Sequence, residues 1–171
     1  PGVDKVIAEE LPKLKEVFHK PVMANVSGFC VEDYACTCER LDREEQVGWL
    51  EVNISCPNVH GGGMSFGTDP KAGGGVAGGG GRAAAEVTAA VKKVTTKPVI
   101  MKLSPNVTDI TEIAKACEGA GADGISLINT LQGMRISLKT RKPILANVMG
   151  GVSGPAGVPG ALRVVGQGWR V

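Results

Sequence analysis

The feature that most constrains the fold is the regular alternation of short apolar runs with amphipathic segments. The apolar runs at 21–26, 49–55, 98–104 and 124–129 are typical of strands. They begin 28, 49 and 26 residues apart, and two of these steps match one compact strand-plus-helix unit. Repeated units of this kind build a parallel sheet, either an open doubly wound sheet or part of a β/α barrel.

The segments around the apolar runs carry apolar residues at helical spacing. The predicted helices cover 3–18, 31–41, 87–94 and 110–117. Pro12 should interrupt the first helix and restart it. Thr108 can cap the start of the last helix, and Gly121 suits its end.

The length of the chain favours an incomplete barrel over a closed one. A complete β/α barrel typically needs about 250 residues, whereas this chain has 171. We therefore expect an α/β fold, a (β/α)8 TIM barrel of which only the central half to two-thirds is present. Residues 1–171 should form a single domain, with a flexible glycine-rich surface insertion at 73–82.

Charge and cysteine content exclude several classes of function. The formal net charge of +2 gives no strong attraction to nucleic acid or to an anionic membrane. The five cysteines are odd in number, and none shows the C-x2-C spacing of a zinc or iron-sulfur site. A reducing, cytoplasmic setting without a bound metal is the expectation.

Polar residues follow the predicted strands at the point where each one ends. They are Asn25, then Asn53 with Cys56 and Asn58, then Lys102, then Asn129 with Thr130. Each of these alone is more often a capping or loop residue. Because ligands of parallel α/β folds bind at the carboxyl ends of the strands, the set together predicts a site for a planar, oxygen-rich, anionic small molecule.

Cys56 and Lys102 are the most informative of these residues. Cys56 precedes Pro57 in a segment that must turn out of the sheet, and its thiol could act as a nucleophile or as a general base. A cysteine hydrolase would need an orienting histidine, for which His60 is the nearest candidate. Lys102 lies in an apolar strand, where a buried ammonium needs a ligand or a carboxylate, and this makes it a functional candidate. A purely structural ion pair has little support, because Glu51 is the one acidic residue near the neighbouring strand ends.

Several segments resemble the catalytic subunit of class 1B dihydroorotate dehydrogenases. They are Glu-Val-Asn-Ile-Ser-Cys-Pro-Asn-Val at 51–59, Gly-Thr-Asp-Pro at 67–70, Lys-Pro-Val-Ile-Met-Lys-Leu-Ser-Pro-Asn at 97–106, Ser-Leu-Ile-Asn-Thr at 126–130 and Lys-Pro-Ile-Leu-Ala-Asn at 142–147. The resemblance covers residues 1–72 and 83–156. The pyrimidine-reducing domain of dihydropyrimidine dehydrogenases is similar, but it usually has His where this chain has Asn58.

The resemblance implies a flavin enzyme that oxidises (S)-dihydroorotate to orotate in pyrimidine (UMP) biosynthesis. Cys56 matches the family's catalytic base, which removes the C5 proton while the C6 hydrogen leaves as hydride to FMN. The residues that match substrate contacts are Asn53, Asn58, Asn129 and Thr130. The residues that match FMN contacts are Asn25, Asn53, Lys102, Ile128 and Gly154.

The resemblance also implies partners. Class 1B enzymes pass electrons to NAD through a second subunit that carries FAD and a 2Fe-2S cluster, and a homodimer of catalytic subunits within a heterotetramer is expected. The family has further strands before residue 1 and after residue 171, and the tail from Gly157 departs from its pattern. The alternatives are therefore a dihydropyrimidine dehydrogenase-like FMN domain or a non-catalytic barrel fragment, and we expect residues 1–171 alone not to bind FMN tightly.

Overall fold

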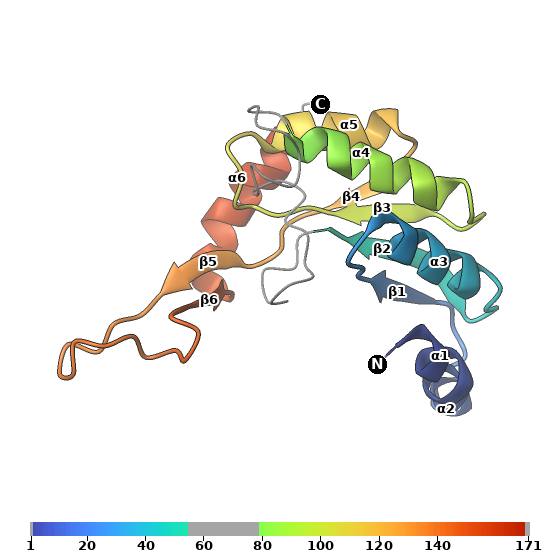
Figure 1. Cartoon of the computed structure of the whole chain (residues 1–171), viewed down its shortest axis with the longest axis horizontal. Coiled ribbons are helices and arrows are strands. Elements are labelled where there is room, and N and C mark those ends of the chain that lie inside the picture. The colour runs from blue at the N-terminus through green and yellow to red at the C-terminus, as the bar shows by residue number, and fades with distance from the viewer. Residues whose placement is uncertain (1, 55–78, 170–171) are drawn as a thin grey trace.

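A four-stranded parallel sheet forms the centre of the structure, a computed structural model that describes residues 2–54 and 79–169 (Figure 1). The strands are β1 (Val22–Val26), β2 (Val47–Asn53), β3 (Val99–Lys102) and β4 (Gly124–Ser126). They lie side by side in chain order, β1-β2-β3-β4, and each neighbouring pair is parallel. An open doubly wound sheet reverses its strand order at a switch point. The sequential order is instead that of a barrel segment, so the four predicted strands and the partial barrel are confirmed.

Helices α3 (Val31–Asp42), α4 (Gly79–Lys92) and α5 (Ile110–Gly119) cover one face of the sheet (Figure 1). Successive side chains of a strand point to opposite faces. Leu50, Val52 and Met101 point toward the helices and are fully buried. Met23 and Trp49, on the opposite face of β1 and β2, remain 48% and 42% exposed. The described helices therefore leave this second face uncovered.

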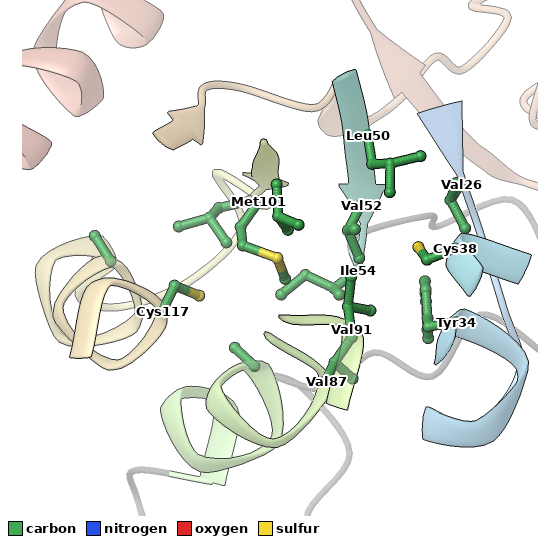
Figure 2. Close-up of a cluster of buried hydrophobic side chains, with 14 of the residues drawn as sticks. Val26, Tyr34, Cys38, Leu50, Val52, Ile54, Val87, Val91, Met101 and Cys117 are labelled. Carbon is green, nitrogen blue, oxygen red and sulfur yellow. The ribbon is translucent and has the colours of Figure 1, made fainter. Parts of the chain in front are cut away.

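The helices complete the core with small and aromatic side chains. Figure 2 shows Tyr34 and Cys38 of α3, Val87 of α4 and Cys117 of α5 converging on the buried strand residues. Burial raises the pKa of the Cys38 thiol to about 12. Burial also raises the pKa of Cys117 to about 11, against the lowering effect of a hydrogen bond with Thr88. Both thiols are therefore neutral packing groups, as their positions on apolar helix faces predict.

The amino-terminal helix passes through three conformations. It consists of α1 (Val3–Lys5), the π-helical segment η1 (Val6–Glu10) and α2 (Leu11–Val17). Pro12 lies in the first turn of α2, directly after the π-helical segment. Glu10 and Leu11 keep right-handed helical dihedral angles, so the helix changes type just before Pro12 and the predicted break does not occur.

A carboxylate joins the end of α3 to the start of β3. Asp42 Oδ1 accepts hydrogen bonds from Thr95 Oγ1 at 2.6 Å, Thr96 N at 2.8 Å and Lys97 N at 3.3 Å. Lys97 Nζ in turn donates to the backbone oxygens of Leu41 and Glu44. These bonds fix the turn that delivers the chain into β3.

The carboxyl-terminal part of the structure contains elements that the sequence analysis did not predict. They are the antiparallel strands β5 (Leu131–Met134) and β6 (Met149–Val152), the short helix η2 (Pro155–Gly157) and α6 (Val158–Gly168). Figure 1 shows the β5–β6 hairpin extending away from the helix layer. Within the described ranges, no helix combines the length and apolar character that a membrane span requires.

Two local predictions need correction. α4 begins at Gly79, so residues 79–82 of the predicted flexible insertion are helical, while 73–78 lie outside the described residues. The cap of α5 is Asp109, which accepts a hydrogen bond from Thr111 N, and the prediction of Thr108 was wrong. The predicted exit of α5 is correct, because Gly121 has a φ of +96° that favours glycine.

Candidate functional site

Polar side chains gather on the uncovered face of the sheet, near the carboxyl ends of its strands. Asn53, Lys102 and Ser126 are register partners across β2, β3 and β4, so their side chains share one face. Asn25 of β1 pairs with Glu51 of β2 on the same face, one step nearer the start of the strands. The structure thus brings the predicted residues Asn25, Asn53 and Lys102 to one region.

Glu51 lies at the centre of this group and contacts three strands. Its Oε2 accepts a hydrogen bond from Asn25 Nδ2 at 2.5 Å and lies 3.6 Å from Lys102 Nζ. Its Oε1 accepts a hydrogen bond from Ser126 Oγ at 2.7 Å. The Glu51 and Lys102 side chains are only 15% and 26% exposed, so little solvent separates the two charges.

The surroundings of Glu51 keep it ionised. Burial raises the pKa of the carboxyl group, but the hydrogen bonds from Ser126 and Asn25 and the charge of Lys102 together hold the pKa below its ordinary value. Glu51 and Lys102 therefore face each other as an ion pair. Lys102, for which a ligand or a carboxylate was expected, has Glu51 as its partner in the described residues.

Asn53 connects this group to the segment after β4. Asn129 Nδ2 donates a hydrogen bond to Asn53 Oδ1 at 3.3 Å. The backbone oxygen of Asn53 accepts a hydrogen bond from the Tyr34 hydroxyl at 2.9 Å, and Tyr34 is itself a core residue of α3. The end of β2 is thus held from the helix side while the Asn53 amide faces Asn129.

The segment that carries Asn129 and Thr130 is fixed by a second asparagine. Asn106 Nδ2 donates to the backbone oxygen of Thr130 at 3.1 Å, and Asn106 Oδ1 accepts from Gln132 N at 3.0 Å. Asn129 Oδ1 accepts a hydrogen bond from Thr130 N at 2.8 Å. Asn106 therefore bridges the segment after β3 and the segment after β4.

The Thr130 hydroxyl is a buried polar atom that has no hydrogen-bond partner among residues 2–54 and 79–169. It is covered by β6, because a Cβ placed on Gly151 would lie 2.5 Å from Thr130 Oγ1. Leaving a buried hydroxyl unpaired is unfavourable by about 1–3 kcal/mol. Because β6 approaches Thr130 so closely, residue 151 has room for glycine but not for a Cβ atom.

The remaining predicted flavin residues lie on either side of the hairpin. Ile128 is partly buried and packs against the hydrophobic core. Gly154 follows β6 with a φ of +102° and a ψ of −169°, a conformation open essentially only to glycine. A Cβ at Gly154 would meet no atom within 4 Å, so glycine is required there by the backbone conformation and not by crowding.

The three candidate site residues Cys56, Asn58 and His60 fall outside the described residues. Their predicted roles stay predictions. In the described ranges, no group of three or more His, Cys, Asp and Glu side chains could hold a metal ion.

Three residues that organise the site were not predicted as part of it: Glu51, Ser126 and Asn106. Glu51 was considered only as a partner for a structural lysine. A signal was present, because Glu51 and Asn53 are two positions apart and so share the face on which Lys102 also lies. Ser126 and Asn106 are short polar residues common in loops and at strand ends, and nothing in the sequence alone distinguishes them.

Sequential parallel strands with polar side chains at their carboxyl ends are typical of β/α-barrel enzymes. Within that class, the sequence model of the family "Dihydroorotate dehydrogenase" matches residues 1–168, and the chain belongs to this family. The chain is 53% identical over 167 residues to the "Dihydroorotate dehydrogenase B (NAD(+)), catalytic subunit" of Enterococcus faecalis. It is 52% identical over 167 residues to the protein of the same name from Listeria monocytogenes serotype 4a.

These matches cover 98% of this chain but 50% and 51% of the two relatives, so the chain spans about half the length of the curated relatives it matches. The resemblance to class 1B catalytic subunits is therefore confirmed. The family match also includes the tail after Gly157, where α6 lies, which the sequence analysis had placed outside the resemblance. The family is FMN-dependent in general.

Proposed function

We propose that the natural protein containing this chain oxidises (S)-dihydroorotate to orotate with FMN, in pyrimidine biosynthesis in the cytoplasm. The observation that carries the proposal is the polar group on the uncovered sheet face. There Asn25 and Lys102 both contact Glu51, and Asn53, the register partner of Lys102, accepts a hydrogen bond from Asn129. We further propose that residues 1–171 belong to one barrel domain.

The donors on this face fit a flavin. The edge of the isoalloxazine ring carries nitrogen and oxygen acceptors, and the Asn25 amide, the Asn53 amide and the Lys102 ammonium are suitable donors at one end of the sheet. Lys102 also supplies positive charge, which favours an electron-rich ring. Ile128 would contribute an apolar contact, and Gly154 an approachable backbone. We assign FMN binding to these five residues.

The substrate would lie beside the flavin, at the ends of β2 and β4. Asn53, Asn58, Asn129 and Thr130 would bind the polar edges of dihydroorotate. The Asn53–Asn129 hydrogen bond supports this placement, because it joins the two strand ends at one point.

The reaction needs one base and one hydride acceptor. Cys56 would take the proton from C5 of dihydroorotate as a thiolate, and Asn53 and Asn129 would hold the ring in place while it does so. Bound FMN supplies the acceptor for the hydride that leaves C6. Removal of this proton and this hydride leaves the C5–C6 double bond of orotate, so atoms and electrons balance.

The electrons would pass to NAD through a partner subunit. Two relatives carry the words "NAD(+)" and "catalytic subunit" in their names, which supports a second, electron-transferring subunit here. We propose that this partner carries FAD and a 2Fe-2S cluster, and that two catalytic subunits form a homodimer within a heterotetramer.

The test is anaerobic reduction of the purified natural protein. FMN should be released on denaturation in about one equivalent per chain, and dihydroorotate should bleach the flavin absorbance. Dihydrouracil is the control substrate, since an enzyme of the dihydropyrimidine dehydrogenase type would respond to it. Bleaching by dihydrouracil alone, or a protein without flavin, would contradict the proposal.

A further inference from the structure

We propose that Glu51 is a positioning residue of the flavin site, which orients Asn25 and Lys102 and offsets the charge of Lys102. This inference rests on the proposed function, since it assumes that FMN binds beside these two residues. It concerns a residue that contacts two of the five assigned flavin residues at a single oxygen, Oε2.

The first argument is geometric. Asn25 is an exposed residue on β1, and a free side chain there would sample several rotamers. Its Nδ2 donates to Glu51 Oε2, which directs the amide toward the Lys102 side of the sheet. Ser126 Oγ holds the other oxygen of the same carboxylate, across β3 from β2. Both carboxylate oxygens of Glu51 therefore have partners, so the carboxylate can hold the Asn25 and Lys102 side chains in place.

The second argument is electrostatic. An ammonium next to a flavin stabilises the anionic reduced ring, and so raises the reduction potential. The carboxylate 3.6 Å from Lys102 opposes that effect because its charge has the opposite sign. Both side chains are largely buried, so screening by water is weak. Glu51 therefore weakens, without abolishing, the positive charge that Lys102 presents to the ring.

The alternative is an ion pair with a structural role alone. In that case, neutralising Glu51 would change the stability of the sheet but leave the flavin potential unchanged. The two roles thus differ in a quantity that does not depend on turnover. The reduction potential of bound FMN is that quantity.

The experiment compares Glu51→Gln, Lys102→Gln and the double variant in the natural protein, expressed in full. Gln keeps the approximate size of each side chain while removing its charge. Glu51→Gln should raise the potential and Lys102→Gln should lower it, with the double variant near the wild type. We expect roughly a tenfold change in the ratio of affinities for reduced and oxidised FMN in each single variant, which is about 30 mV for a two-electron couple.

A distant carboxylate provides the matched control. Glu45, whose side chain is 91% exposed beside Lys15, lies far from the strand ends, so Glu45→Gln should leave the potential unchanged. If Glu51→Gln alone does not fold, the difference in flavin potential between Lys102→Gln and the double variant gives the effect of the Glu51 charge instead. A potential unchanged by loss of the Glu51 charge, or lowered by it, would overturn the inference.

A second variant tests orientation separately. Glu51→Asp keeps the charge but withdraws the carboxylate by one methylene, so it should leave the potential near that of the wild type. It should weaken FMN binding several-fold, measured as the Kd from flavin fluorescence. An unchanged Kd would remove the positioning role. Two outcomes separate this inference from the proposed function. If the wild type binds FMN and is reduced by dihydroorotate, and the Gln and Asp variants behave like it, this inference alone is overturned. If the wild type contains no FMN, the proposed function is overturned as well.

Discussion

Replacing Asn106 with alanine should weaken substrate binding without removing the flavin. The Asn106 amide donates to the Thr130 backbone oxygen and accepts from Gln132 N, at 3.1 and 3.0 Å. Asn106→Ala leaves both backbone groups without this partner. Each such neutral hydrogen bond is worth about 1 kcal/mol, so the segment after β4 loses about 2 kcal/mol of support.

Since this segment carries the proposed substrate residues Asn129 and Thr130, the loss should appear in substrate affinity. If the whole loss of about 2 kcal/mol weakens the ligand-bound state, the KM for dihydroorotate and the Kd for orotate should each rise about 30-fold. FMN content should remain that of the wild type, because the assigned flavin residues keep their contacts.

Steady-state kinetics and orotate titration of the flavin spectrum provide the measurement. Asn106→Asp keeps an acceptor for Gln132 N but loses the donor to Thr130, so its effect should be intermediate. Asn147→Ala is the matched control, as that asparagine is exposed in the β5–β6 connection. A KM within twofold of the wild type in Asn106→Ala, at full FMN content, would refute the reasoning.

Four further outcomes are expected. Cys56→Ser should strongly slow flavin reduction by dihydroorotate in stopped flow while orotate still binds, because a hydroxyl is deprotonated near neutral pH to a far smaller extent than a thiol. Near wild-type rates would remove Cys56 from the mechanism. The hydrogen bonds from Thr95 and from the neighbouring amides lower the pKa of Asp42 below its ordinary value of 3.8. The stability that the Asp42 carboxylate contributes is therefore fully present above pH 3.8 and is lost as the pH falls through the lowered pKa. Below pH 3.8, the stability of Asp42→Asn should fall less steeply with decreasing pH than that of the wild type. Leu50→Ala should lower the free energy of unfolding by about 3 kcal/mol, measured in urea, because Leu50 is fully buried. Gly154→Ala should lower it by about 2 kcal/mol, since an L side chain is strained at a φ of +102°; no change in either unfolding midpoint would contradict the packing described here.

The strands of the sheet could be predicted because their side chains alternate between two environments. In β3, Val99 and Met101 are buried while Ile100 and Lys102 are partly exposed, which matches a strand with one face on helices. The apolar runs also made the spacing of the units visible. Fold class therefore followed from pattern and chain length.

The hairpin and the last helix could not be predicted in this way. β5 and β6 are four residues each, and Met149–Val152 contains two glycines, a residue depleted in strands. The sequence of α6 includes Pro159, Gly160 and Gly166, which are poor helix formers. Tertiary contacts outweigh propensity here, since Val164 of α6 is buried.

The sequence predicted which strand ends carry the site residues, but not which side chains contact one another. Lys102 was recognised as a cation that needs a partner, but spacing alone does not show whether a ligand or Glu51 provides it. The side chain of Glu51 reaches Lys102 and Ser126 on two other strands, and such contacts depend on the register and curvature of the sheet. Similarly, the bridge from Asn106 to Thr130 joins residues 24 positions apart.

A crystal structure of the natural protein with FMN and orotate would test the central claim most directly. The account predicts that the flavin ring lies on the sheet face opposite α3, α4 and α5, within hydrogen-bond distance of Asn25 and Lys102, with orotate against Asn53 and Asn129. A flavin bound elsewhere, with the Glu51–Lys102 pair turned away from it, would contradict the account.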